Sequence, residues 1–325
     1  MSDGEARTSP RVVVEVLSAE QVGTIHSASL GVLEHTGVYV EDAEALDILS
    51  DGGCDVDRGS GMVKLPPDVV EAAVASCPER VLLAGRTPEH DVWLEAGGAV
   101  RFTNFDEGIR YVDPRSGELR DPGKADVADV ARLIDALTEI DTYEAAIGPL
   151  DVPVKTASVH GCEAALLNTL KPVGVEAVDR REARACIALA AEVVGGADEL
   201  AERPIIGMGV CPLSPLKLTR DACEVIIESA RANISDVVLS MAMSGGSAPV
   251  TLAGTLVQHN TEVLAGLTLA QLTERGAPCI YGSSTTAMDL RLASASVGSP
   301  ELALISACAA QIAKQYRLPS YIAGA

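Results

Sequence analysis

Lysine and aromatic residues are scarce in this chain. Aromatic residues make up 3% of it, only 6 of the 25 basic residues are lysine, and the formal net charge is −21. A nucleic-acid-binding protein normally carries the opposite sign, and an anionic membrane surface would repel such a chain. We therefore expect no nucleic acid and no membrane among its partners. An acidic, lysine-poor surface is typical of halophilic proteins, in which salt screens self-repulsion; a GC-rich genome that replaces lysine by arginine is the alternative.

The sequence also lacks the segments that direct a protein out of the cytoplasm. Residues 1–11 have no apolar core of a signal peptide, and no run reaches the roughly 18 apolar residues of a membrane span. None of the eight cysteines lies in a C-x-x-C pair, which excludes the common zinc and redox motifs. We expect buried free thiols, a cytoplasmic location and no bound metal.

General catalytic motifs are absent as well. The chain has no P-loop, no G-x-S-x-G, no H-E-x-x-H and no G-x-G-x-x-G. Function must therefore be sought in the residues that follow predicted strands.

Residues 1–122 are predicted to form a first domain of helices and antiparallel hairpins. Residues 1–12 are expected to be disordered. Helical spacing covers 18–35, with Ser18 as the cap and Gln21 three residues later. Two shorter helices are predicted from "DAEALDILSDGG" and "PPDVVEAAVASCP", and two hairpins around Gly97-Gly98 and "DPRSG".

Residues 123–325 are predicted to alternate between strands and helices. Apolar strand patterns begin at Tyr143, Lys171, Pro204, Asp236, Pro278 and Pro319, and helical patterns cover 158–169, 180–194, 218–231, 253–274 and 299–316. Alternation of this kind indicates a parallel sheet. The even spacing favours a (β/α)8 barrel of the TIM type, in the α/β class, over the alternative of a doubly wound sheet.

Six βα units are visible, whereas a barrel of this type has eight strands in about 250 residues. We therefore expect an incomplete barrel that lacks its C-terminal units. Its unpaired strand edges would favour aggregation, so this form is expected to be unstable and inactive. The chain stops after a strand, at a position where barrel enzymes place catalytic residues.

Two loops after predicted strands are the strongest site candidates. "SGGSAPVTLAGTL" is rich in Gly and Ser before a helix, which suits close backbone approach to a ligand or simply a tight turn. "YGSSTTAMD" offers four hydroxyl side chains in a row and Asp289, which suit a small polar site or Asx and ST turns. Gln258, His259 and Glu262 lie on the next predicted helix and could contact a cation or be a solvated face. His160 is more often a structural hydrogen-bonding residue than a ligand.

Several long stretches resemble the trimethylamine:corrinoid methyltransferase family, which also contains glycine betaine methyltransferases. They are "TNFDEGIRYVDPRSGELR", "GVCPLSPL", "SAPVTLAGTLVQHNTEVLAGLTLAQ", "YGSSTTAMDLR", "VGSPELALI" and "YRLPSYIAG". The resemblance covers the chain from about residue 30 to its end. It implies a barrel that holds a methylated amine in line with the Co(I) of a separate corrinoid protein.

The resemblance implies the remaining expectations. The reaction would convert trimethylamine to dimethylamine and methyl-Co(III) in methanogenesis from methylamines. The corrinoid would be carried by the cognate partner protein, with no cofactor bound by this chain, which would form a homo-oligomer. Substrate-binding residues would be Glu262, Tyr281 and Asp289 near the amine, with Ser283 and Ser284 lining the pocket.

The family also suggests why the chain stops where it does. Members that use trimethylamine carry pyrrolysine, encoded by UAG, shortly after the "LPS…AG" strand, so a catalytic pyrrolysine is expected directly after Ala325. Two alternatives stay open. The first is a truncated betaine-type enzyme. The second is an inactive fragment or a protein that binds the corrinoid partner without turnover.

Overall fold

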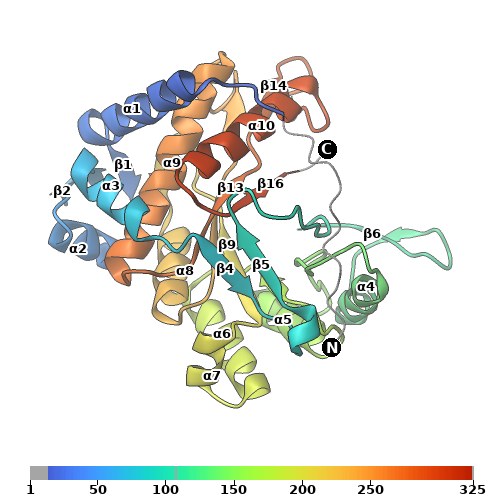
Figure 1. The fold of residues 1–325 in the computed structure, drawn as a ribbon. Coiled ribbons are helices and arrows are strands. Elements are labelled where there is room, and N and C mark those ends of the chain that lie inside the picture. Colours follow the sequence, from blue (N-terminus) through green and yellow to red (C-terminus); the bar gives the residue numbers. More distant parts are fainter. Residues whose placement is uncertain (1–13, 107, 324–325) are drawn as a thin grey trace.

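A parallel sheet forms the centre of the computed structural model, which describes residues 14–106 and 108–323 (Figure 1). Its strands are β8 (Val173–Val175), β9 (Ile206–Val210), β11 (Asp236–Ser240), β13 (Cys279–Ser283) and β16 (Ser320–Ile322). Every neighbouring pair is parallel. The order in the sheet, β16-β13-β11-β9-β8, follows the order along the chain. A doubly wound sheet reverses its strand order at a switch point, so that alternative is wrong for this sheet.

The first of the six predicted strands is not a strand in the structure. Residues 141–147 make only isolated bridges, among them Tyr143 with Val173. Tyr143 N–H donates to Pro172 O and Gly174 N–H donates to Tyr143 O. Pro172 has no N–H group to donate, so fewer backbone hydrogen bonds can join this segment to its neighbour in the sheet. The described sheet therefore has five strands instead of six, and closure into an eight-stranded barrel stays a prediction.

Helices between the strands fall close to their predicted ranges. They are α5 (Ala157–Leu166), α6 (Arg180–Val194), α8 (Arg220–Arg231), α9 (Leu252–Thr273) and α10 (Pro300–Gln315). Capping explains the start of α10, where the Ser299 hydroxyl accepts from Leu302 N at 3.2 Å and Pro300 occupies the first turn. Two helices were not predicted, α4 (Lys124–Ala136) and α7 (Ala197–Glu202).

The N-terminal helices pack on the outer side of α9 (Figure 1). They are α1 (Ala19–His35), α2 (Ala43–Asp51) and α3 (Pro67–Ser76), and α1 begins with the predicted capping box of Ser18 and Gln21. A small sheet joins them, with β1 (Val38–Val40), β2 (Asp55–Asp57), β3 (Met62–Lys64) and β10 (Lys217–Leu218). Because β10 follows β9 in the chain, this sheet contains segments from both predicted domains; the boundary at residue 122 stays a prediction.

The first predicted hairpin is wrong. Strand β5 (Val92–Glu95) pairs with the upstream strand β4 (Arg80–Leu83), and not with residues after Gly98. Cross-strand contacts explain the choice, because the Arg80 guanidinium lies 4.5 Å from the Trp93 ring centroid and 3.0 Å from Glu95 Oε2. The chain after Gly98 runs instead beside residues 141–147.

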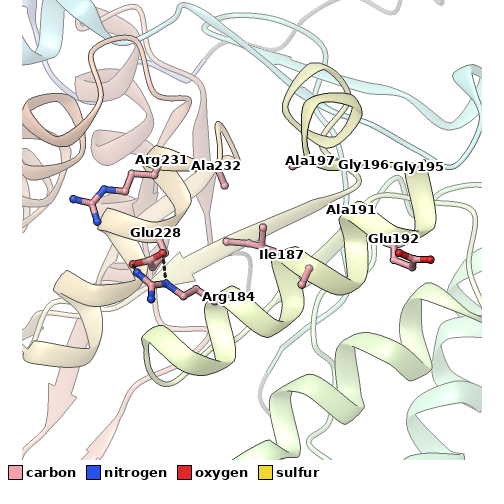
Figure 2. A pocket seen from close by; sticks show the side chains of 11 residues that line it. Arg184, Ile187, Ala191, Glu192, Gly195, Gly196, Ala197, Glu228, Arg231 and Ala232 are labelled. Carbon is pink, nitrogen blue, oxygen red and sulfur yellow. Dashed lines mark hydrogen bonds and ion pairs between the residues drawn. The ribbon is translucent and has the colours of Figure 1, made fainter.

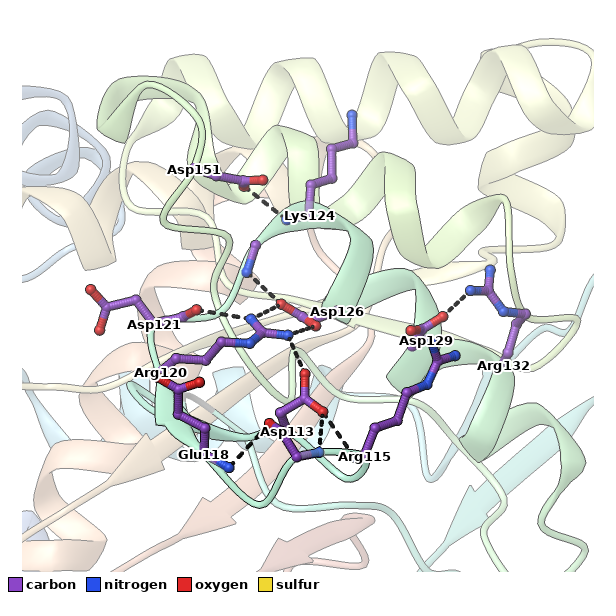
Figure 3. A network of polar contacts seen from close by, with 12 residues as sticks. Asp113, Arg115, Glu118, Arg120, Asp121, Lys124, Asp126, Asp129, Arg132 and Asp151 are labelled. Carbon is purple, nitrogen blue, oxygen red and sulfur yellow. Dashed lines mark hydrogen bonds and ion pairs between the residues drawn. The ribbon is translucent and has the colours of Figure 1, made fainter.

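The second predicted hairpin is confirmed, with β6 (Tyr111–Val112) antiparallel to β7 (Leu119–Arg120). Arg120 fastens it to α4 (Figure 3), because its guanidinium donates to both Asp126 carboxylate oxygens at 2.7 and 2.6 Å and to Asp113 Oδ2 at 3.1 Å. Arg120 holds the pKa of the Asp126 carboxyl below its usual range. Salt bridges and a cation–π contact of Arg120 with Tyr111 therefore hold a hairpin that buries little apolar surface.

Cysteine side chains are mostly buried, as predicted. Seven of the eight are buried, Cys211 is exposed, and all eight are free thiols. Burial raises the pKa of the Cys54 thiol to about 11, so it stays protonated near neutral pH. No helix in the described ranges combines the length and apolar character needed to cross a membrane. The disorder predicted for residues 1–12 lies outside the described residues.

Asp236, the first residue of β11, is buried, and its carboxyl oxygens have no hydrogen-bond partner among the described residues. Burial raises the pKa of Asp236 to about 8, from an ordinary value of 3.8. The folded chain therefore holds a proton that the unfolded chain has released above about pH 4. This residue should make the folded state most stable at low pH and progressively less stable as the pH rises towards 8.

We expect Asp236→Asn to remove that pH dependence, because asparagine does not ionise. Between pH 5 and 8 the wild-type free energy of unfolding should fall relative to the variant's by up to about 1.4 kcal/mol per pH unit. Urea unfolding at pH 5, 6, 7 and 8 measures both slopes. Asp55→Asn, at an exposed strand start, is the matched control and should keep the wild-type slope. Parallel curves for wild type and Asp236→Asn would contradict the assignment.

Candidate active site

Small residues on one face of the sheet leave room at the carboxyl ends of the strands. Tyr281 of β13 faces the helices, so its neighbour Gly282 faces the opposite, inner side. A Cβ atom at Gly282 would lie 2.7 Å from Leu239 Cα. A Cβ at Gly174 would overlap the Glu144 carboxylate, and one at Gly209 would lie 3.6 Å from Glu176 Oε1. Glycine at position 174 therefore gives the Glu144 carboxylate room over the inner face, and the Glu176 carboxylate lies over Gly209 at ordinary contact distance.

Three carboxyl groups and a phenol gather there. We call Asp106, Glu144, Glu176 and Tyr321 the carboxylate cluster. Glu144 follows Tyr143, Glu176 directly follows β8, and Tyr321 lies in β16. Burial raises the pKa of Tyr321 well above its ordinary value, and the charges of Glu144, Asp106 and Glu176 raise it further. Residues far apart in the sequence thus act on one another electrostatically at this end of the sheet.

Glu144 holds its proton near neutral pH. Burial of the carboxyl group, and then the charge of Asp106, raise the pKa of Glu144 to about 8, although a hydrogen bond from Thr142 opposes the shift. Burial also raises the pKa of Asp106. Neutralising a carboxyl group in this way is the expected response to a site where anions are crowded and poorly solvated. A bound cation would reverse the effect.

A cavity of about 360 Å³ adjoins the cluster between α5 and β8. Its walls are mainly apolar and include Tyr143, Ala145, Ile147, Cys162 and Val173, while Glu176 supplies a carboxylate. Apolar walls with a few polar groups are typical of small-molecule sites. This combination suits a ligand that carries both methyl groups and a positive charge.

A second hollow, of about 600 Å³, lies on the outer surface between α6 and α8 (Figure 2). The Arg184 guanidinium at its edge donates to the two Glu228 carboxylate oxygens at 2.8 and 2.9 Å. The hollow is lined mainly by the second halves of both helices, which lie towards the amino ends of the strands in a βα unit. Barrel enzymes place their chemistry at the opposite end, so we assign the site to the carboxylate cluster.

Glu262 on α9 connects the loops at the carboxyl ends of two strands. Its carboxylate accepts from Ser214 Oγ at 2.8 Å, Leu216 N at 3.0 Å, Ser240 Oγ at 2.7 Å and Gln258 Nε2 at 3.0 Å. The side chain is buried, with 1% exposure. These contacts hold the loop after β9 and the end of β11 against α9; the amine-binding role of Glu262 stays a prediction.

The other predicted binding residues are spread over different environments. Tyr281 OH donates to Asn260 Oδ1 at 2.9 Å within the helix layer. Ser283 is fully buried, and its Oγ has no partner among the described residues. Ser284 is half-buried and its N–H donates to Ser240 O at 2.9 Å. Asp289 accepts from Arg291 N and Leu292 N in an Asx turn, the alternative considered above. The binding roles of these four residues stay predictions.

Three further candidates have local partners. The Gln258 amide donates to Ser247 O at 2.8 Å as well as to Glu262. His259 Nδ1 lies 2.9 Å from Thr285 Oγ1, and burial lowers the pKa of His259 to about 3, so the ring is neutral. His160 Nδ1 lies 3.0 Å from Lys124 Nζ. In the described part of the chain, no group of three or more His, Cys, Asp or Glu side chains is arranged to hold a metal ion.

Sequence reasoning missed Asp106, Glu144 and Glu176. A signal existed for two of them, since Glu144 lies inside the first strand-like pattern and Glu176 directly follows β8, where barrel enzymes place functional residues. Asp106 gave no such signal, because it comes from the N-terminal region and reaches the sheet only through tertiary contacts.

Comparison with known proteins identifies a family. The model of the trimethylamine methyltransferase (MTTB) family matches residues 4–325. A trimethylamine methyltransferase of Desulfitobacterium hafniense (strain DSM 10664 / DCB-2) is 45% identical over 307 residues, which cover 94% of this chain and 62% of that protein. One from Methanosarcina mazei is 42% identical, over 96% of this chain and 64% of that protein. A glycine betaine methyltransferase of Desulfitobacterium hafniense (strain Y51) is 30% identical over 95% and 64%.

Solved structures agree on the fold. The crystal structure of the monomethylamine methyltransferase of Methanosarcina barkeri superposes with a TM-score of 0.54 at 15% identity, over 92% of this chain and 65% of that chain. The chain thus spans less than two thirds of the length of these relatives. The pyrrolysine predicted after Ala325 lies outside the described residues and stays a prediction. The match across residues 4–325 confirms the resemblance inferred from the sequence motifs: the chain belongs to the trimethylamine methyltransferase family.

Proposed function

We propose that this chain carries the amine-binding part of a methyltransferase that moves a methyl group from trimethylamine to the Co(I) of a cognate corrinoid protein. The products are dimethylamine and methyl-Co(III), in methanogenesis from methylamines. The family match over residues 4–325 carries the proposal. The cavity beside the carboxylate cluster supports it, because apolar walls and carboxylates together suit a methylated ammonium ion.

The chain's own residues bind and orient the amine. Trimethylamine is mainly protonated near neutral pH. The carboxylates Glu144 and Glu176 of the cluster offer its charge a partner, and Tyr143, Ile147 and Val173 of the adjoining cavity offer apolar surface for its methyl groups. The electron pair of the breaking C–N bond stays on nitrogen. The leaving group of the trimethylammonium ion is therefore neutral dimethylamine. Co(I) supplies the electron pair of the new bond to the methyl carbon. Holding the amine in line with this nucleophile lowers the entropic cost of the transfer.

An apolar rim around the carboxyl ends of the strands supports the docking of a corrinoid protein. Leu213, Met241, Val250 and Leu290 are large exposed side chains in the segments after β9, β11 and β13. Exposed apolar side chains in these loops would suit a protein–protein interface. Cytoplasmic location, homo-oligomers and a halophilic source belong to the same proposal. The family and the net charge of −21 support these three proposals. Activity measured at rising KCl concentration tests the halophilic source.

Glycine betaine is the second candidate substrate, since a relative carries that name. Betaine bears a carboxylate as well as a quaternary ammonium group and would need a cation beside its negative end. Among the described residues, no basic group shifts the pKa of Glu144, Asp106 or Tyr321. The shifts come from burial, from acidic neighbours and from polar groups. This surrounding favours a pure cation over a zwitterion.

Calorimetric titration at pH 9 separates the two substrates. The trimethylammonium ion and tetramethylammonium should bind, and glycine betaine should bind at least tenfold more weakly because its carboxylate meets the cluster. Tighter binding of glycine betaine than of trimethylamine would overturn the trimethylamine assignment.

A further inference from the structure

Residues 102–106, which we call the strap, run parallel to the segment that carries Glu144. Phe102 N–H donates to Asp141 Oδ2 at 2.8 Å, and Asp141 N–H donates back to Phe102 O at 2.7 Å. Thr103 Oγ1 donates to Thr142 O at 3.2 Å, and residues 103 and 142 form a parallel bridge. The strap thus covers the edge of the segment 141–147, although it belongs to the N-terminal region.

Asn104 in the strap bonds to both backbone polar groups of Glu144. Its Nδ2 donates to Glu144 O at 3.0 Å, and its Oδ1 accepts from Glu144 N at 3.0 Å. The side-chain amide thereby replaces the two bonds that a neighbouring strand would normally supply. Asn104 Nδ2 also donates to Phe105 O at 2.6 Å, which ties the same amide to the strap itself.

This clamp determines where two carboxyl groups of the cluster lie. With its backbone held, the Glu144 side chain extends into the space over Gly174 that a Cβ atom would fill. Asp106 follows Asn104 by two residues, so the same strap brings its charge to Glu144. The strap therefore connects the N-terminal region to the amine site.

We propose that Asn104 is a positioning residue of the amine site, which holds the Glu144 carboxyl group over Gly174 and beside Asp106 so that Glu144 can exchange its proton for a bound ammonium ion. This inference rests on the proposed function. Asp106 from the strap and Thr142 from its own segment act on the Glu144 carboxyl group, and the charge of Glu144 acts in turn on Tyr321 from β16 and on Tyr143. Glu176 after β8 acts on the same Tyr321.

The direction of the pH dependence follows. Burial and the Asp106 charge raise the pKa of Glu144 to about 8, so a permanent cation must displace a proton below that pH. Affinity for tetramethylammonium, which has no proton of its own, should therefore rise by up to about tenfold per pH unit up to pH 8 and then level off. Titrations at pH 7 in phosphate and in Tris, which differ in ionisation enthalpy, should report the release of close to one proton per cation bound.

Asn104→Ala tests the positioning role with tetramethylammonium chloride as the probe. Loss of the clamp lets the Glu144 carboxyl reach solvent and move away from Asp106, so the pKa of Glu144 should fall. The pH midpoint of binding should move down by about one unit, and affinity at pH 9 should weaken about tenfold. Asn104→Asp keeps the shape and the acceptor but adds a negative charge, so its midpoint should move up instead.

Thr103→Val is the matched control, because it removes one strap bond, to Thr142 O, without touching Glu144. It should lower the melting temperature slightly and keep the wild-type midpoint. If Asn104→Ala and Asn104→Asp both keep the wild-type pH midpoint of binding, Asn104 has only a structural role and the inference is overturned. If Asn104→Ala does not fold, the midpoint of Asn104→Asp decides alone. If the wild-type protein binds no tetramethylammonium at any pH, the proposed function fails instead.

Discussion

Replacing Glu262 by alanine is expected to lower the free energy of unfolding by roughly 3–5 kcal/mol. The Glu262 carboxylate accepts four hydrogen bonds, from Ser214, Leu216, Ser240 and Gln258. Alanine would leave these donors without their acceptor in a site that is 1% exposed at Glu262. Since a buried unpaired polar group costs more than the net value of one bond, the loss should exceed that of a typical cavity. Urea unfolding at pH 7 measures it.

Two further variants define the cause. Glu262→Gln keeps the shape and one acceptor oxygen, so its loss should be smaller than that of the alanine variant. Glu192 is an exposed glutamate in the last turn of α6, and Glu192→Ala should change the stability by no more than about 0.5 kcal/mol. A Glu262→Ala variant as stable as Glu192→Ala would mean that water replaces the carboxylate at no cost, which contradicts the tethering role.

Glu144→Gln should weaken tetramethylammonium binding by about 30- to 100-fold at pH 9, the effect of removing one partner of a poorly solvated charge pair. At pH 9 the Glu144 carboxyl, whose pKa burial raises to about 8, is ionised in the wild-type protein and can pair with the cation. At pH 6 it is protonated, so wild type and variant should bind almost equally. The variant should also lose the proton release seen in two buffers.

Glu163→Gln is the control for this variant. Glu163 lies on α5, and it pairs with Lys124 on the surface. Its replacement should leave both the affinity and its pH dependence unchanged. A Glu144→Gln variant that keeps the wild-type pH dependence would show that another group of the cluster titrates in its place.

Local sequence patterns were sufficient for most helices and for five of the six predicted strands of the parallel sheet. The capping box at Ser18 and the Ser299-Pro300 start of α10 were both confirmed, because a cap depends only on residues within one turn. The hairpin around Gly97-Gly98 was wrong because turn residues permit a reversal but do not choose the partner strand. Cross-strand contacts of Arg80 chose β4 instead.

The candidate site depended much more on tertiary structure. Tyr281 was predicted beside the amine because it lies near the end of a strand, yet its hydroxyl is bonded to Asn260 in the helix layer. A one-residue change of position along a strand moves a side chain to the other face, and an apolar strand that is buried on both faces carries no pattern to say which. Burial of all five residues of β13 is an instance of that ambiguity.

By itself, the sequence determined the α/β class, the parallel sheet, the helix boundaries and the family, because these follow from short-range periodicity, caps and long motifs. Tertiary structure alone decided that the strap brings Asn104 and Asp106 to Glu144, about 40 residues away along the chain. No local pattern encodes such a contact, since it exists only when the edge of the segment 141–147 is free to accept the strap. The proton affinity of Glu144 follows from that arrangement, because burial and a neighbouring charge act through space.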